Sequence, residues 1–151
     1  MDEMIVKARK KALTLLTDRD RTTGELTERL KKAGFDEETV SDAVSYVKSY
    51  GYIDDARYAR HYIEVMSASR SRERIRFDLL AKGLTSEEVS AAFEEAGDPD
   101  EKDLIRRLAL KKMKSIRKED PAGRTKLIRF LAGKGFRMSD IISVCEDLTQ
   151  N

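Results

Sequence analysis

The chain contains no Trp, one Cys, one His, two Pro and eight Gly in 151 residues. A single Cys cannot close an internal disulfide, and one Cys with one His cannot supply the ligands of a structural zinc site. Scarce Pro and Gly argue against a β-sandwich or barrel, which needs many turn residues, and exclude collagen-like and low-complexity classes. We therefore expect neither a disulfide framework nor a metal site, and no cofactor.

Long apolar runs are also missing. No stretch approaches the roughly 20 residues of a membrane-spanning helix. The first residues, MDEMIVKARKK, include acids and have no apolar centre, so they do not resemble a signal peptide. We expect a cytoplasmic protein without a membrane partner.

Charge is abundant and unevenly distributed. Charged residues make up 38% of the chain, against a usual share of about 25%. The net charge of +2 divides into −1 for residues 1–54, −3 for 55–100 and +6 for 101–151. A basic end on a mildly acidic body indicates an oriented encounter with a polyanion or an acidic protein surface. The alternative is an ordinary solvated helix face.

An internal repeat is the most informative feature. The segments 24–44, 72–93 and 124–145 superpose without gaps at offsets of 49 and 52 residues. The shared positions are Leu26/Ile75/Leu127, Leu30/Leu79/Leu131, Gly34/Gly83/Gly135, Phe35/Leu84/Phe136, Val40/Val89/Ile141 and Ala43/Ala92/Val144. Each copy is typical of two helices joined by a turn, with apolar positions four residues apart and Gly at a left-handed C-cap.

Local capping patterns support these helices. Thr22 to Glu25 and Thr85 to Glu88 are capping boxes, whereas the third copy has Arg137 at the capping position. We therefore expect Ser139 to cap its second helix, which would start late. Asp98 and Pro99 suit the cap and first position of a helix that follows them.

A further helix precedes each pair, at 4–17, 55–67 and 100–117. The predicted fold is all-α, with three tandem three-helix repeats at 1–53, 54–97 and 98–151 in an elongated, curved, monomeric array. The stretch 44–53 comes nearest to a strand pattern, but its apolar spacing also continues a helix that ends at Gly51.

Catalytic chemistry is not indicated. His61 stands alone within a helix, Cys145 aligns with apolar positions, and Gly133 to Gly135 form a helix end rather than a phosphate-binding loop. The paired acids at helix starts suit the helix dipole. We expect a protein that is not an enzyme.

Two groups of residues are candidates for binding. All five Tyr lie between 46 and 62, either as a platform on which unpaired bases stack or, the interpretation we favour, as a wedge that packs the first repeat against the second. Arg occupies every second position from 70 to 76 at a helix start, where cations oppose the dipole, which favours a binding role against phosphates or carboxylates. The candidate residues for binding a nucleic acid or an acidic surface are Arg70, Arg72, Arg74, Arg76, Lys111, Lys112, Arg124 and Lys126.

The segment 51–59 resembles the signature of the RecX family, regulators of the RecA recombinase. It reads Gly51, Tyr52, Ile53, Asp54, Asp55, Ala56, Arg57, Tyr58, Ala59. The basic run that leads into Ile75, Leu79 and Lys82 to Leu84 is similar to a second family segment. The chain departs from that segment at 67–70, where Ser-Ala-Ser-Arg replaces a frequent Gly and Lys.

The resemblance implies a non-enzymatic regulator in DNA repair, homologous recombination and the SOS response. It implies binding in the groove of a RecA–single-stranded DNA filament, with restraint of strand exchange, ATP hydrolysis and coprotease activity and possible direct contact with the DNA. The signature residues are expected to be largely structural, with Asp54 capping the next helix and the two Asp holding Arg57. A duplex-DNA transcription factor and a protein-only helical adaptor are the alternatives, although acids such as Glu87 and Glu88 on the second helices disfavour groove reading.

Overall fold

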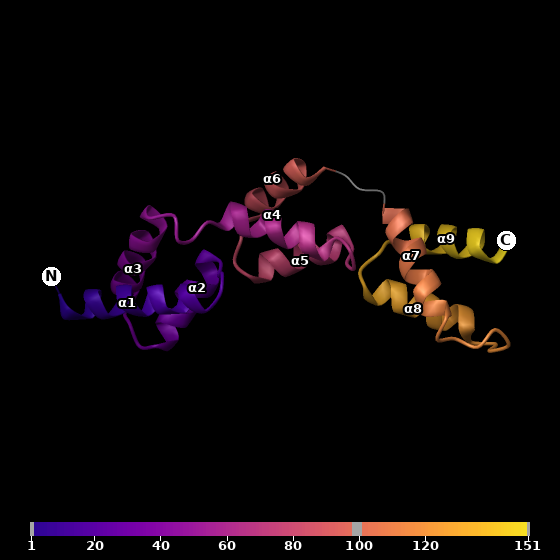
Figure 1. Cartoon of the computed structure of the whole chain (residues 1–151), viewed down its shortest axis with the longest axis horizontal. Coiled ribbons are helices and arrows are strands. Elements are labelled where there is room, and N and C mark those ends of the chain that lie inside the picture. Colours follow the sequence, from indigo (N-terminus) through magenta and orange to yellow (C-terminus); the bar gives the residue numbers. More distant parts are fainter. Residues whose placement is uncertain (1, 98–100, 151) are drawn as a thin grey trace. The chain divides into compact units, whose positions relative to one another are not determined.

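The computed structural model describes residues 2–97 and 101–150 and contains only helices within them. Figure 1 follows the helices in chain order. They are α1 (Glu3–Asp18), α2 (Thr23–Lys32), α3 (Glu37–Ser49), α4 (Asp55–Met66), α5 (Arg72–Ala81), α6 (Ser86–Ala96), α7 (Glu101–Met113), α8 (Gly123–Gly133) and α9 (Met138–Gln150). The predicted all-α class and the tandem three-helix repeats are confirmed. The caps expected from Asp98 and Pro99 lie outside the described residues.

The predicted glycine caps are confirmed. Gly34, Gly83 and Gly135 have φ of +98°, +98° and +92°, a region that residues with a Cβ rarely adopt. At the end of α2 the N–H groups of Gly34 and Phe35 donate to the carbonyls of Lys31 and Leu30 at 3.0 and 3.4 Å. This pattern satisfies carbonyls that a helix end leaves open, so each Gly marks where the first helix of a pair stops.

The two capping boxes also form as predicted. The Thr22 hydroxyl accepts from the Glu25 N–H at 3.1 Å, and the Glu25 carboxylate accepts from the Thr22 N–H at 3.0 Å. Thr85 and Glu88 make the same reciprocal pair at 3.1 and 2.8 Å. Two open donors at each helix start are therefore satisfied locally.

Two helix ends differ from the predictions. α9 begins at Met138, which aligns with the first residues of α3 and α6, so the late start expected from capping by Ser139 is wrong. Burial of Ile141, Val144 and Cys145 holds this helix in register without a side-chain cap. α7 ends at Met113 instead of residue 117, because the chain turns there and folds Ile116 back against the core.

The structure divides into two compact units. One consists of Met1–His61 with Asp78–Glu95, and the other of Tyr62–Phe77 with Ala96–Asn151. The second repeat therefore contributes segments to both units. The predicted repeat boundaries at residues 53 and 97 stay predictions.

The first compact unit is built around α1, α2 and α3. Ala8 and Ala12 on α1 let α3 approach closely, with Leu26, Leu30 and Val47 filling the centre of the core. All five side chains are fully buried. The repeat positions at 26 and 30 are thus core positions, as their spacing predicts.

A joint inside this unit ties α2 to segments more than thirty residues away. The Thr22 hydroxyl donates to the carbonyl of Lys82, and Asp55 at the start of α4 accepts from the backbone N–H of Thr23 at 2.8 Å. Gly24 lies so close that a Cβ added to it would be 2.9 Å from the Lys82 carbonyl oxygen and 3.0 Å from the Cα of Gly83. Backbone is therefore packed directly on backbone at this joint.

The second compact unit contains an equivalent joint. The buried Ser71 hydroxyl caps α5 by accepting from the Arg74 N–H at 3.0 Å and donates to the carbonyl of Lys134 at 3.1 Å. Glu101 at the start of α7 accepts from the backbone N–H of Arg72 at 2.7 Å. The repeat offsets relate Thr22 to Ser71 and Lys82 to Lys134, so the same joint occurs twice in the sequence repeat.

The core of the second unit lies between α7, α8 and α9. Leu104, Ile105, Leu127, Leu131 and Ile141 are buried in it. Cys145 is 2% exposed, and burial raises the pKa of its thiol despite the nearby charge of Arg124. Cys145 thus occupies a core position, as its alignment with apolar positions predicts, and His61 is exposed on α4.

Candidate nucleic-acid interface

The basic surface begins where α5 starts. Arg70 precedes the helix and donates to the Tyr62 hydroxyl at 3.0 Å, whereas Arg72, Arg74 and Arg76 lie in its first two turns. The Glu101 carboxylate at the first N–H of α5 offsets the unfavourable position of these cations against the helix dipole. All four of these arginines interact with other residues of the chain.

The Ser71–Lys134 hydrogen bond places the start of α5 beside the C-terminal end of α8. Lys134 reaches from there to the ring of Phe130, with its Nζ atom 5.1 Å from the ring centroid. Lys112 on α7 approaches the same ring at 5.0 Å. Phe130 thus holds two ammonium groups by cation–π attraction in one small area.

A hollow of about 550 Å³ opens next to this ring. Its charged side chains are Lys112, Arg117, Asp120, Lys126 and Arg129. Four cations around one carboxylate give a site that attracts phosphate oxygens. Hydrogen bonds from Lys or Arg to phosphate are charge-assisted and therefore stronger than hydrogen bonds between neutral groups.

Asp120 is already engaged within this hollow. Its carboxylate accepts from Lys126 Nζ at 2.7 Å and from the Ala122 N–H at 2.8 Å. The hydrogen bond from Lys126 has the larger effect and that from Ala122 the smaller one, and together they hold the pKa of Asp120 below its ordinary value. The remaining cations of the hollow, Lys112, Arg117 and Arg129, form no ion pair with Asp120.

We expect Lys126→Ala to raise the pKa of Asp120 toward its ordinary value of 3.8. The ion pair with Lys126 stabilises the folded chain while Asp120 is ionised, and this stability is lost as the pH falls through the lowered pKa of Asp120. Without Lys126, Asp120 should therefore become protonated at a higher pH. Titration of the Asp120 carboxyl carbon by nuclear magnetic resonance measures this, with Lys111→Ala as the control. An unchanged Asp120 titration in Lys126→Ala would contradict the pairing.

The structure brings together only some of the predicted third-repeat residues. Lys112 and Lys126 line the same hollow, whereas Lys111 is exposed on α7 and Arg124 borders a different groove. The sequence prediction did not include Arg117, Lys134 or Phe130 in this site. No signal in the linear sequence pairs Phe130 with Lys112, since they come from different helices.

The signature segment 51–59 has mainly structural contacts. Gly51 has φ +74° and follows the C-cap of α3. Asp54 caps α4 by accepting from the Arg57 N–H at 3.1 Å, and Ala59 is fully buried. Asp55 belongs to the joint with Thr23. No ion pair joins Arg57 to either Asp within the described part of the chain, so the expectation that they hold Arg57 is wrong.

Three of the five tyrosines form one cluster of rings, in which Tyr50 meets Tyr46 edge to face, with ring centroids 5.2 Å apart, and stacks on Tyr52. Tyr46 packs partly against the first core under the Arg9 guanidinium, which lies 4.3 Å from the ring centroid. Tyr50 and Tyr52 are 61% and 53% exposed and stack on each other at 5.7 Å. The predicted wedge of all five tyrosines between the first and second repeats is therefore wrong for Tyr50 and Tyr52, because both side chains are mostly exposed. The centroid of the Tyr58 ring lies 5.8 Å from the Nζ atom of Lys82.

Neither a metal centre nor a membrane helix occurs among residues 2–97 and 101–150. No group of three or more potential ligands could hold an ion there. None of the helices in these ranges has the length and apolar content to cross a bilayer.

Three joined three-helix domains with a basic third repeat place the chain in a class of tandem helical-domain proteins. Family models described as the first, second and third three-helix domains of RecX match residues 8–46, 54–92 and 100–145. The chain therefore belongs to the RecX family.

Individual relatives agree with this assignment. The chain is 29% identical to "Regulatory protein RecX" of Clostridium perfringens over 99% of its length and 72% of the relative. It is 34% identical to the protein of that name from Caldanaerobacter subterraneus over 89% of its length and 67% of the relative. The crystal structure of RecX from Lactobacillus salivarius matches the whole of both chains with a TM-score of 0.80 at 22% identity, which shows the shared fold. Another RecX crystal structure matches with a TM-score of 0.81 at 24% identity, over 95% of this chain and 74% of the other.

Proposed function

We propose that this chain is a non-enzymatic, cytoplasmic regulator that binds the RecA filament on single-stranded DNA as a monomer and restrains its recombinase, ATPase and coprotease activities. Membership of a family whose relatives are named regulatory proteins supports a regulatory role. In this proposal the chain acts in DNA repair, homologous recombination and the SOS response.

The observation that carries the proposal is the basic hollow beside Phe130. Its lining concentrates Lys112, Arg117 and Arg129 around a carboxylate that Lys126 already neutralises. The joint at Ser71 places Arg72 and Arg74 beside the end of α8, next to Lys134. In this proposal the cations meet phosphates of the DNA or carboxylates of RecA, and both groups suit lysine and arginine side chains.

Removing the positive charge of the hollow is expected to weaken binding of this chain to the filament. The triple variant Lys112→Ala/Lys126→Ala/Arg129→Ala is expected to weaken inhibition of RecA ATPase at least tenfold, because contacts with anions disappear while the fold is retained. The control triple variant Lys10→Ala/Lys11→Ala/Lys31→Ala removes three exposed cations of the first repeat and is expected to inhibit normally.

Co-sedimentation with RecA, with and without single-stranded DNA and nucleotide, measures binding directly. If the hollow contacts phosphates, log affinity decreases with log salt concentration, and the magnitude of that slope should become smaller by about 0.7 for each contact removed. A triple variant that inhibits and co-sediments like the wild type would exclude the hollow as the interface.

The same assay tests the predicted arginine run. The quadruple Arg→Ala variant at positions 70, 72, 74 and 76 is expected to keep its helical circular-dichroism spectrum and to lose inhibition. Arg60→Ala is the control, because Arg60 is exposed and pairs with the surface carboxylate of Glu95. Full inhibition by the quadruple variant at moderate salt would leave the third-repeat hollow as the sole candidate.

A further inference from the structure

A second hollow in the C-terminal compact unit differs in chemistry from the basic one. It is an open groove of about 460 Å³ between α7, α8 and α9. Its apolar lining comes from Leu110, Met113, Ile116, Leu127, Cys145 and Leu148. No aromatic ring lines it, so it offers nothing on which a nucleobase could stack.

Part of this apolar lining is open to water. Leu110 is 47% exposed and Met113 is 40% exposed, although both lie on the same helix as the buried Leu104 and Ile105. Burial raises the pKa of the Cys145 thiol, so this side chain adds no charge to the apolar lining. The aliphatic part of this lining suits aliphatic side chains from a partner helix.

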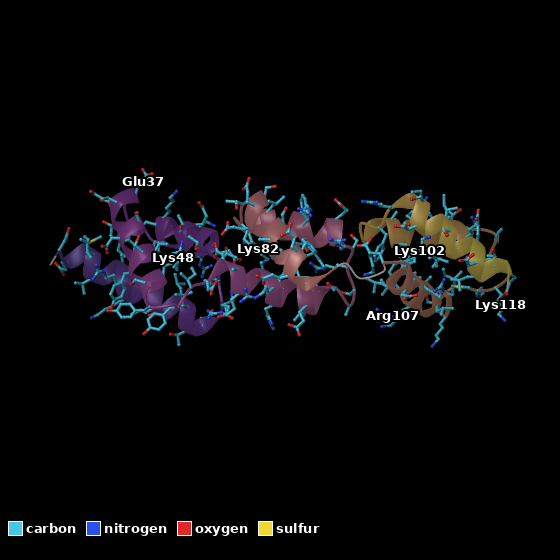
Figure 2. All side chains as sticks on the ribbon, turned by 90° about the horizontal axis from the view of Figure 1, so that it is seen from above. Glu37, Lys48, Lys82, Lys102, Arg107 and Lys118 are labelled. Carbon is cyan, nitrogen blue, oxygen red and sulfur yellow. The ribbon has the colours of Figure 1, made fainter. Side chains whose placement is uncertain are left out.

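The rim of the groove is strongly basic. Lys114, Arg117, Lys118 and Arg124 surround it, all exposed, and none of them forms an ion pair with a described residue. Figure 2 shows Lys118 extending away from the ribbon. The only acid of the lining, Asp120, is bound by Lys126 and the Ala122 N–H. An occupant with acids beside its apolar face is therefore favoured electrostatically.

We propose that this groove docks an acidic, amphipathic helix of a partner protein. Leucine-like side chains one turn apart enter between Leu110, Met113 and Leu148, and flanking carboxylates reach the rim lysines and arginines. Ile116, Arg117 and Asp120 line both this groove and the basic hollow, whereas Leu110, Met113, Lys114 and Lys118 line the groove without lining the hollow. The contact requires no DNA, and it does not depend on the proposed filament binding.

The test uses three labelled synthetic helical peptides with the full-length chain, without RecA or DNA. The first carries Leu at positions i, i+3, i+4 and i+7 with Glu elsewhere, the second replaces every Glu by Lys, and the third replaces every Leu by Ala. Fluorescence anisotropy is expected to give saturable binding of the Leu/Glu peptide with a Kd below about 100 μM. The other two should bind at least tenfold more weakly. Absence of Leu/Glu binding, or equal binding of the Leu/Lys peptide, would overturn the proposal.

Variants of the chain locate the binding. Leu110→Glu is expected to weaken binding of the Leu/Glu peptide at least tenfold, whereas the control Leu80→Glu, at a position 42% exposed on α5, should bind normally. The rim pair Lys114→Glu/Lys118→Glu should also lose binding, and the control pair Lys10→Glu/Lys11→Glu should not. Binding that survives Leu110→Glu would overturn the assignment to this groove.

A second copy of the chain is the competing occupant. Light scattering of the wild type at rising concentration is expected to show a constant mass. A dimer that Leu110→Glu dissociates would overturn the proposal in favour of self-association. Because the peptide assay contains no filament, its failure and the failure of the proposed function are separate results.

Discussion

Replacing Leu79 with Ala is expected to lower the free energy of unfolding by about 2–5 kcal/mol. Leu79 is fully buried, as are Leu30 and Leu131 at the same position of the other repeats. Truncation removes apolar contacts and leaves a cavity that surrounding helices fill only in part. Urea unfolding followed by circular dichroism measures the change.

The adjacent residue provides a matched control. Leu80 is 42% exposed, so Leu80→Ala is expected to cost less than about 1 kcal/mol, because little apolar surface leaves contact. Equal losses for the two variants would mean that the helical phase of α5 is wrong.

Replacing Gly24 with Ala is expected to destabilise the chain, although Ala is the better helix former by about 1 kcal/mol. Gly24 lies in α2 with ordinary helical backbone, but its new Cβ would meet the Lys82 carbonyl oxygen at 2.9 Å. Backbone atoms cannot rotate away as a flexible side chain can, so the joint must open. We expect a net loss of about 1–3 kcal/mol, the range of an overpacked contact.

Gly133 is the control for this effect. It also lies within a helix, at the end of α8, but nothing lies within 4 Å of its added Cβ. Gly133→Ala is therefore expected to leave stability unchanged or to raise it by up to about 1 kcal/mol. Thermal unfolding of both variants gives the comparison, and a Gly24→Ala protein as stable as Gly133→Ala would show that the joint is not packed as described.

The joint between α2 and the start of α4 also explains why the role of Asp55 in the signature segment could not be predicted from the sequence. Asp54 caps its own helix and could be assigned from its neighbours. Asp55 accepts from Thr23, 32 positions earlier, and this partner has no trace in the local pattern. The sequence-based expectation of an Asp–Arg57 pair considered only nearby residues.

The basic surface shows the same limit. Net charge predicted that the third repeat is the basic one, and both Lys112 and Lys126 were among the predicted binding residues. Their common hollow depends on how α7 and α8 pack, which also brings in Arg117 and Phe130. The apolar groove could not be predicted from the sequence, because it combines core residues such as Leu127 with exposed ones such as Leu110 from another helix.

Local sequence patterns specify the helices, their repeat and most of their ends, because capping boxes and glycine C-caps are hydrogen bonds among residues at most six apart. Tertiary structure alone decided where α7 stops, why α9 starts without a cap, and which distant groups meet at the joints. The Thr22 hydroxyl and the Lys82 carbonyl are 60 residues apart. Contacts of that separation depend on packing, and helical periodicity specifies which face is buried but not what covers it.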